Sequence, residues 1–130
     1  MDTSRIAAVP AFAGLPASEL EALARVMGEV EVEAGARVVT AHGDGTAVYF
    51  IEQGDADVVN DDGDVAAALG TGDLFGEIGL LLTGQRIATV VARTPMRLLS
   101  LSGYDFDRVR PRVPEAEESL RRLGLERSGR

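Results

Sequence analysis

Residues 29–101 are a series of short segments rich in Val, Ile, Thr and aromatic residues, separated by turns that contain Gly or Asp. The first, Glu29–Glu33, alternates valine with glutamate, which is the two-residue period of a half-buried strand. The six that follow are Arg37–Thr40, Thr46–Glu52, Asp55–Asn60, Asp64–Leu69, Arg86–Arg93 and Arg97–Leu101. Many short strands at a spacing of roughly 8–12 residues are typical of a sandwich or barrel, and not of alternating strand–helix units. The sequence therefore predicts a mainly β domain.

Both ends of the chain are predicted to be helical. Apolar residues of Ser18–Met27 recur at the spacing of one helical face. This helix has two candidate starts, a capping box at Ser18 or a first turn at Pro16. Beyond the β region, prolines divide the helical pattern into Tyr104–Arg110 and Glu115–Leu123. We expect one domain over 1–130, with a helical segment over about 1–28, the β region over 29–102 and C-terminal helices over 103–130.

Composition excludes several kinds of site. The 130 residues include no Cys and one His, His42, so disulfides, Cys-ligated zinc, thiol catalysis and multi-His metal sites are excluded. The 21 acids outnumber the 13 cations, all arginine, and the net charge of −8 argues against nucleic acid as a partner. Apolar runs fall short of the roughly 18 residues of a spanning helix, and Asp2 and Pro10 disfavour a signal peptide, so a cytoplasmic module that does not itself enter a membrane is expected.

One interruption of the β region carries the candidate chemistry. Residues 72–90 read Gly-Asp-Leu-Phe-Gly-Glu-Ile-Gly-Leu-Leu-Leu-Thr-Gly-Gln-Arg-Ile-Ala-Thr-Val. A short helix beginning at Glu77 would leave backbone N–H groups near Gly76 to favour an anion. The guanidinium of Arg86 has the planar fork of donors that suits a phosphate, and Glu77 can accept a hydrogen bond from a sugar hydroxyl. A ligand with one phosphate close to one sugar hydroxyl is a cyclic nucleotide.

At these residues the sequence resembles the cyclic nucleotide-binding domain family. Residues Phe75–Val90 match its phosphate-binding cassette, F-G-E-[ILV]-[AGS]-L-L followed after a spacer by R-x-A-[TS]-V. Flanking matches are Phe12–Leu15, Gly43-Asp44, Tyr49–Ile51 with Gly54, and Tyr104–Phe106. The resemblance implies a β jelly-roll (double-stranded β-helix) barrel with an N-terminal helix, a short cassette helix and C-terminal lid helices.

The resemblance also implies roles for individual residues. Glu77 would bind the ribose 2′-hydroxyl and Arg86 the exocyclic phosphate oxygens. The remaining implied contacts are phosphate-binding N–H groups of Gly76 and Ala88, pocket-lining Gly79 and Ile87, and Val58 against the base. Members that prefer cGMP often have Thr or Ser at the position of Ile87. Ile has no hydrogen-bonding group for the guanine amino group, so cGMP would bind without that hydrogen bond, which is worth about 0.5–1.5 kcal/mol. This favours cAMP as the ligand and does not exclude cGMP.

The predicted function is therefore a sensor, and not an enzyme, because the sequence offers no nucleophile–base pair. Ligand would close the cassette, and C-terminal helices would cover the base through Leu120, Leu123, Leu125, Arg121 or Arg122. The alternative is a scaffold of the same fold that binds no nucleotide and serves interaction or dimerisation. No cofactor is expected, the effector domain or partner protein is not identified, and a homodimer stays open. Arginine-only, Ala- and Val-rich composition suggests a bacterial source.

Two further motifs have simpler interpretations. His42, beside Gly43-Asp44, is expected to be a solvated turn residue because it has no second His or Cys. Asn60–Asp64 superficially suggests a calcium loop, but the first and last ligand positions would fall on Val58 and Leu69. A hairpin turn is predicted there instead.

Overall fold

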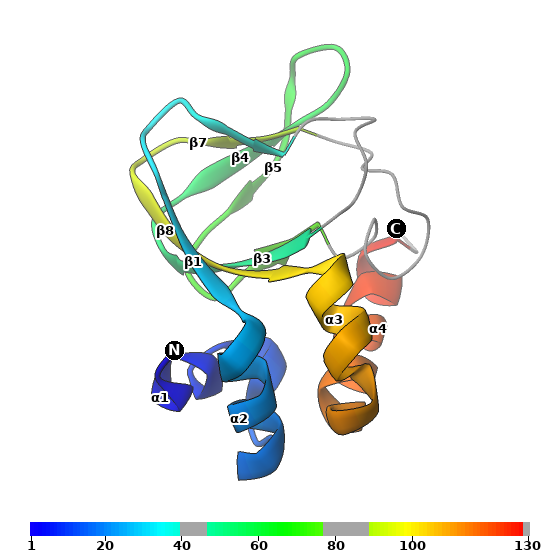
Figure 1. The fold of residues 1–130 in the computed structure, drawn as a ribbon. Coiled ribbons are helices and arrows are strands. Elements are labelled where there is room, and N and C mark those ends of the chain that lie inside the picture. The colour runs from blue at the N-terminus through cyan, green and yellow to red at the C-terminus, as the bar shows by residue number, and fades with distance from the viewer. Residues whose placement is uncertain (40–46, 77–88, 129–130) are drawn as a thin grey trace.

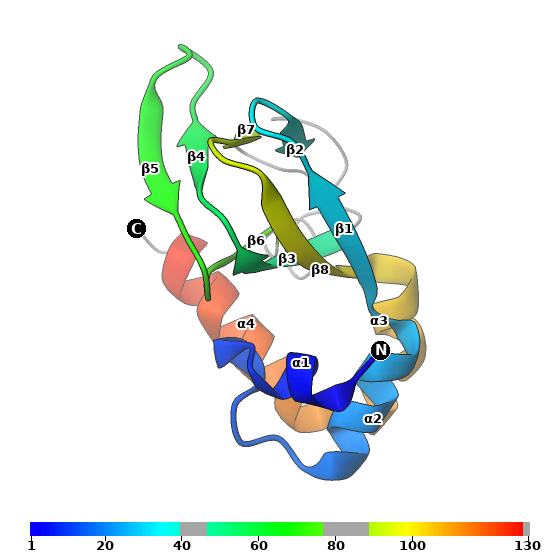
Figure 2. The same ribbon diagram turned by 90° about the vertical axis from the view of Figure 1, so that its left-hand side faces the viewer.

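Two four-stranded antiparallel sheets lie over a layer of helices in the computed structural model, which describes residues 1–39, 47–76 and 89–128 (Figure 1). One sheet has the order β1 (Gly28–Val32), β8 (Met96–Ser102), β3 (Ala47–Gln53), β6 (Leu74–Phe75). The other has the order β2 (Arg37–Val39), β7 (Thr89–Ala92), β4 (Ala56–Val59), β5 (Val65–Leu69). Apart from the β4–β5 hairpin, neighbours in each order are distant in sequence, as in a jelly roll, and Figure 2 shows the two sheets facing each other. The predicted fold class is confirmed.

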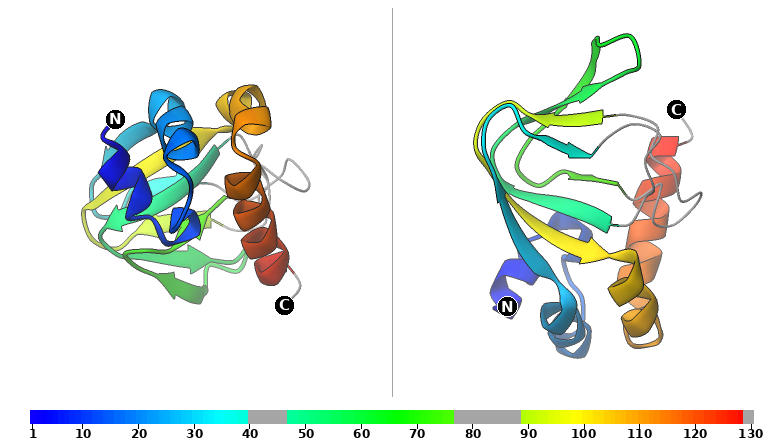
Figure 3. Two further views of the ribbon diagram at one scale, coloured as in Figure 1. Left: turned by 90° about the horizontal axis from the view of Figure 1, so that it is seen from below. Right: turned by 45° about the horizontal axis from the view of Figure 1, so that its top comes forward.

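The helices come from both ends of the chain and gather on one side of the β1-β8-β3-β6 sheet (Figure 3). They are α1 (Thr3–Ala7), η1 (Pro10–Phe12), α2 (Ala17–Val26), α3 (Gly103–Val109), η3 (Arg110–Arg112) and α4 (Pro114–Ser128). The capping box predicted at Ser18 is wrong, because α2 begins at Ala17 with Pro16 as its N-cap. Helix α4 also runs beyond Leu123, where the sequence pattern ended it. No helix in the described ranges is long and apolar enough to cross a membrane.

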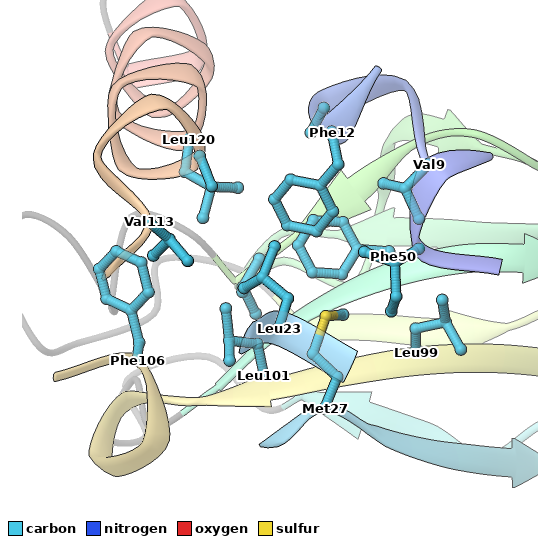
Figure 4. Close-up of a cluster of buried hydrophobic side chains, with 14 of the residues drawn as sticks. Val9, Phe12, Leu23, Met27, Phe50, Leu99, Leu101, Phe106, Val113 and Leu120 are labelled. Carbon is cyan, nitrogen blue, oxygen red and sulfur yellow. The ribbon is translucent and has the colours of Figure 1, made fainter. Parts of the chain in front are cut away.

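The β1-β8-β3-β6 sheet is buried on both faces. Along β3, Val48 and Phe50 face the helices, and Ile51 faces the other sheet. The helix side holds the larger cluster, where the rings of Phe12 and Phe50 lie 4.9 Å apart, and Figure 4 shows side chains from the helices converging there on β3 and β8. Leu120 of α4 is fully buried in this cluster. It is therefore a core residue in this conformation, and its predicted role as a lid residue over the base would require α4 to leave this packing.

A buried carboxylate joins the two helical ends of the chain. Glu19 in α2 is only 4% exposed, and its oxygens accept hydrogen bonds from the backbone N–H groups of Ala116 (3.0 Å) and Glu115 (3.4 Å) in the first turn of α4. These N–H groups have no partner within their own helix, so an anion stabilises them. Ser119 adds a hydrogen bond of 2.6 Å to the carbonyl oxygen of Ala11. The beginning of α4 is thus fastened to the N-terminal helices.

An ion-pair cluster fastens α1 to the barrel. Arg5 donates to both carboxylate oxygens of Glu52, from Nε at 2.9 Å and Nη2 at 2.6 Å, and Nη2 also donates to Glu29 at 2.8 Å. The hydrogen bonds from Arg5 lower the pKa of Glu52 below its ordinary value, and those to Glu52 and Glu29 raise the pKa of Arg5. Because α1 has only five residues, this cluster contributes to holding it on the barrel.

Replacing Glu52 with Gln should lower the free energy of unfolding by about 1 kcal/mol at neutral pH, since the pair is partly exposed and screened. A depressed carboxylate pKa means that the unfolded state binds more protons once the pH falls below about 4.3. The stabilisation is therefore present above that pH and lost as the pH falls through the folded-state pKa. Urea denaturation at pH 7 and pH 3 should show the difference between wild type and Glu52→Gln shrinking at pH 3. The exposed Glu33→Gln is the control, and an equal loss at both pH values would contradict the prediction.

Candidate functional site

The inner core between the two sheets is less completely covered toward one end of β3 and β4. Near its centre, Ile51, Leu98 and Ala92 are each no more than 3% exposed. Toward the ends of β3 and β4 that lie near the cassette, Tyr49 and Val58 are half-buried and pack against this core. We call this end, marked by Tyr49 and Val58, the open end of the barrel; partly covered apolar side chains of this kind are common in ligand sites.

The cassette segment leaves from and returns to this open end. Strand β6 ends at Phe75, and Gly76 lies against the carbonyl of Ala47, the first residue of β3. On the other side, Thr89 begins β7 and pairs with Val59, at the end of β4 away from the buried Ala56. Glu77, Gly79, Arg86, Ile87 and Ala88 fall between these points and lie outside the described residues, as do His42 and Gly43-Asp44. Their assigned roles stay predictions.

Gly76 has a backbone conformation that other residues rarely adopt. Its φ is +92°, in the region that favours glycine, and a Cβ at this position would lie 2.5 Å from the carbonyl oxygen of Ala47. The requirement for glycine at the beginning of the cassette is thus structural as well as functional. Backbone N–H groups here can approach a ligand without a side chain in the way.

Val58 lies in the wall of the open end, where the sequence predicted a contact with the base. It pairs with Ala67 of β5 on one side and with Val90 of β7 on the other. All four residues from Val65 to Ala68 are exposed, and Val65 is 60% exposed. Apolar strand surface left uncovered beside a half-filled barrel is suited to the flat, weakly polar face of a base. The alanines and Val90 were not among the predicted site residues, because small apolar side chains carry no chemical signature.

Phe75 anchors the beginning of the cassette on the barrel. It is 4% exposed, belongs to the inner core, and stacks on Tyr49 with ring centroids 5.3 Å apart. Tyr49 also pairs with Phe75 across the β3–β6 ladder, so the backbone and the rings fix the same register. Gly76 is thereby held at a defined place against β3.

The Asn60–Asp64 segment is the hairpin turn that the sequence predicted. Asn60 Oδ1 accepts hydrogen bonds of 3.0 Å from the backbone N–H groups of both Asp62 and Asp64, and Gly63 has a φ of +85°. The segment connects the antiparallel partners β4 and β5. Within the described ranges, no group of three or more His, Asp or Glu side chains is arranged to hold a metal ion.

Comparison with known proteins finds similar chains in potassium channels and in protein kinase regulatory subunits. The chain is 37% identical over 124 residues to a cyclic nucleotide-gated potassium channel of Rhizobium etli, covering 95% of this chain and 34% of the channel. Among solved structures, the regulatory subunit of a cAMP-independent protein kinase A from Trypanosoma brucei superposes with a TM-score of 0.82 at 27% identity, covering 94% of this chain and 44% of the subunit. A triply substituted form of that subunit, bound to cAMP in its A site, gives 0.80 at 27% identity, covering 92% and 44%.

The chain thus spans about a third of the channel and less than half of the kinase subunit. The sequence profile of the cyclic nucleotide-binding domain matches residues 29–112. This range contains the whole cassette segment and every described strand, except for Gly28 at the beginning of β1. Fold and sequence agree, and the chain belongs to the cyclic nucleotide-binding domain family.

Proposed function

We propose that this chain is a sensor that binds cAMP at the open end of the barrel. The observation that supports the proposal is that the described residues on either side of the cassette lie at one end of the barrel: Gly76 lies against Ala47 of β3, and Thr89 pairs with Val59, next to the half-buried Val58 of β4. A ligand in this place has its phosphate next to the cassette and its base next to β4 and β5. That is the arrangement a cyclic nucleotide requires.

The polar contacts of the proposed site come from the cassette. Arg86 pairs with the exocyclic phosphate oxygens and Glu77 with the ribose 2′-hydroxyl, while N–H groups of Gly76 and Ala88 add phosphate contacts. Gly79 and Ile87 line the pocket. One arginine at contact distance suffices for a mononucleotide even in a chain of net charge −8, because salt screens the averaged charge within about 10 Å.

Preference for cAMP over cGMP follows from Ile87. A purine amino group on guanine needs a hydrogen-bond acceptor when it is desolvated, and an aliphatic side chain provides none. Adenine has its amino group at another ring position, so the same site binds it without that loss. We expect a modest preference, since one unmade hydrogen bond is worth about 0.5–1.5 kcal/mol.

Signal transmission would run through α4. A ligand shifts a conformational equilibrium only by its differential affinity for the two states. Here the beginning of α4 is held by Glu19 and Ser119, so a movement of the whole helix must break the hydrogen bonds of both. Leu120 packs in the core, whereas Arg121 and Arg122 are exposed. These two arginines are therefore the described residues that could cover the base without leaving the core. A guanidinium can stack on a base, although Arg121 also donates to Glu117 at 2.7 Å.

A second candidate function is a scaffold of this fold that binds no nucleotide. It is favoured by one comparison, since the Trypanosoma subunit is described as cAMP-independent, and its cAMP-bound form carries three substitutions. The fold alone therefore does not decide nucleotide binding. We further propose that the chain is cytoplasmic and regulates an effector domain or partner protein. The identity of that effector, and any assembly into dimers, depend on the protein to which this domain belongs.

Isothermal titration of the chain with cAMP and with cGMP tests the proposal. The expected result is saturable binding of both, tighter for cAMP, with a stabilisation of about 2.7 kcal/mol when ligand exceeds its Kd a hundredfold. Absence of both heat and thermal stabilisation at millimolar ligand would reject the sensor and favour the scaffold. Tighter binding of cGMP would leave the sensor in place and reject the role given to Ile87.

A further inference from the structure

Most described arginines have an acidic partner, as expected in a chain with 21 acids. Arg5, Arg97, Arg110 and Arg121 all lie within 3.6 Å of a carboxylate oxygen. Across the described part of the chain, four arginines form no hydrogen bond, ion pair or ring contact through their side chains: Arg25 in α2, Arg37 in β2, Arg112 in η3 and Arg122 in α4. Of these four, Arg25 and Arg112 lie together.

Arg25 and Arg112 line the same pocket. It lies between α2 and the α3–η3 turn, has a volume of about 310 Å³, and is lined by Ala22, Arg25, Val26, Arg108, Val109 and Arg112. The third arginine, Arg108, has only a long contact of 3.6 Å with Asp105 and stacks over the Tyr104 ring at 5.6 Å. No acidic side chain is among the lining residues. The pocket is therefore a concentrated positive site.

The floor of the pocket is rigid and apolar. Ala22 and Val109 are each 8% exposed and belong to the core between the helices and the sheet. Arg25, Arg108 and Arg112 are exposed around this apolar floor, and their like charges repel one another within the limits that solvent and salt screening allow. An oxyanion would remove the repulsion and accept paired N–H donors from the guanidinium forks.

We propose that this pocket between α2 and the α3–η3 turn binds a compact oxyanion of the phosphate class, separately from the cyclic nucleotide site. A volume near 310 Å³ is at the small end of ligand pockets, which favours a phosphate or pyrophosphate group over a larger molecule. The net charge of −8 disfavours a long polyanion, whose remaining charges would be repelled by the rest of the surface. A compact anion can contact the three arginines without placing further negative charges against the acidic surface.

The position of the pocket separates it from the open end of the barrel. Figure 1 shows α2 and α3 below the β1-β8-β3-β6 sheet, while β4 and β5, which carry the apolar wall, lie above it. A bound oxyanion would bridge α2, from the N-terminal helices, to the segment that follows the barrel. It would act on the same helical layer that Glu19 joins to α4.

The test is titration of the full chain with pyrophosphate at low ionic strength, followed by isothermal calorimetry and ³¹P line broadening. We expect saturable binding that weakens with added salt and drops at least about tenfold in the double variant Arg25→Gln/Arg112→Gln, because hydrogen bonds to charged groups are lost. Arg37→Gln removes an exposed arginine from β2 and should leave the affinity unchanged. All three residues are on the surface, and unchanged melting temperatures would show that the variants are folded.

Saturation with cAMP separates this site from the nucleotide site. If pyrophosphate still binds in the presence of cAMP and in Arg86→Ala, the pocket is an independent site, whether or not cAMP itself binds. Displacement of pyrophosphate by cAMP, or equal binding by wild type and the double variant, would overturn the proposal. Absence of pyrophosphate binding would overturn it as well, and tighter binding of a poly-glutamate peptide would assign the pocket to an acidic protein segment instead.

Discussion

Replacing Arg86 with Ala should weaken cAMP binding by roughly 2–5 kcal/mol, which is the cost of leaving one member of a close charge pair without its partner. The phosphate of cAMP carries one negative charge, and the proposed site has no second cation in its cassette. Backbone N–H groups of Gly76 and Ala88 would retain part of the affinity, so binding should fall by a factor between roughly 30 and a few thousand without disappearing. Calorimetric titration of wild type and variant measures the difference directly.

Arg37→Ala is the matched control for this experiment. It removes the same charge from an exposed position on β2, so any effect of the net charge on ligand approach is shared by the two variants. We expect Arg37→Ala to bind cAMP as wild type does. If Arg86→Ala retains wild-type affinity, the phosphate is held elsewhere and the role assigned to Arg86 is wrong.

Strand β3 was predictable as a continuous run of β-branched and aromatic residues, because it is buried on both faces. On β3, Val48 and Phe50 turn to the helices and Ile51 to the second sheet, so both faces are apolar and the whole segment reads as a strand. Strand β6 was not predicted, since two residues, Leu74 and Phe75, are too few to show a period. It forms because Tyr49 and Phe50 of β3 supply the ladder partners, which is a tertiary effect.

The helical layer was harder to predict from the sequence. Helix α1 and the η1 turn bury Ile6 and Phe12, but they are too short to show a helical face, and only their partners in the core stabilise them. Leu120 has the same ambiguity, since an apolar residue on a terminal helix suits a lid and a core equally well. The hydrogen bond from the Ala116 N–H group to Glu19, 97 residues away in the sequence, holds α4 against the N-terminal helices. In this position Leu120 packs in the core.

For the proposed site, the sequence indicated the chemistry, and the described residues on either side of the cassette indicate at which end of the barrel it would lie. Glu77 and Arg86 were identifiable because charged residues in a fixed spacing carry a chemical meaning. The exposed apolar surface of β5 has no such signal, and becomes visible only when Ala67 is seen beside the half-buried Val58, its partner in β4. Its residues contribute by being small and flat.

Replacing Gly76 with Ala should lower the free energy of unfolding by roughly 2–5 kcal/mol. Part of this is the strain of an L side chain at a φ of +92°, about 1–3 kcal/mol. The rest is overpacking, because the new Cβ would lie 2.5 Å from the carbonyl oxygen of Ala47, and that carbonyl belongs to a paired strand that is not free to move away. Urea denaturation followed by circular dichroism measures the loss.

Gly63→Ala separates the two causes. Gly63 has a similar φ of +85°, but a Cβ there would meet no atom within 4 Å, so only the strain is expected, about 1–2 kcal/mol. A larger loss for Gly76→Ala than for Gly63→Ala identifies the contact with Ala47 as the reason that the cassette must begin with glycine. Equal losses would mean that the backbone relaxes around the methyl group. In that case the glycine serves the ligand and not the barrel, and cAMP affinity should fall in Gly76→Ala while stability differs little from the control.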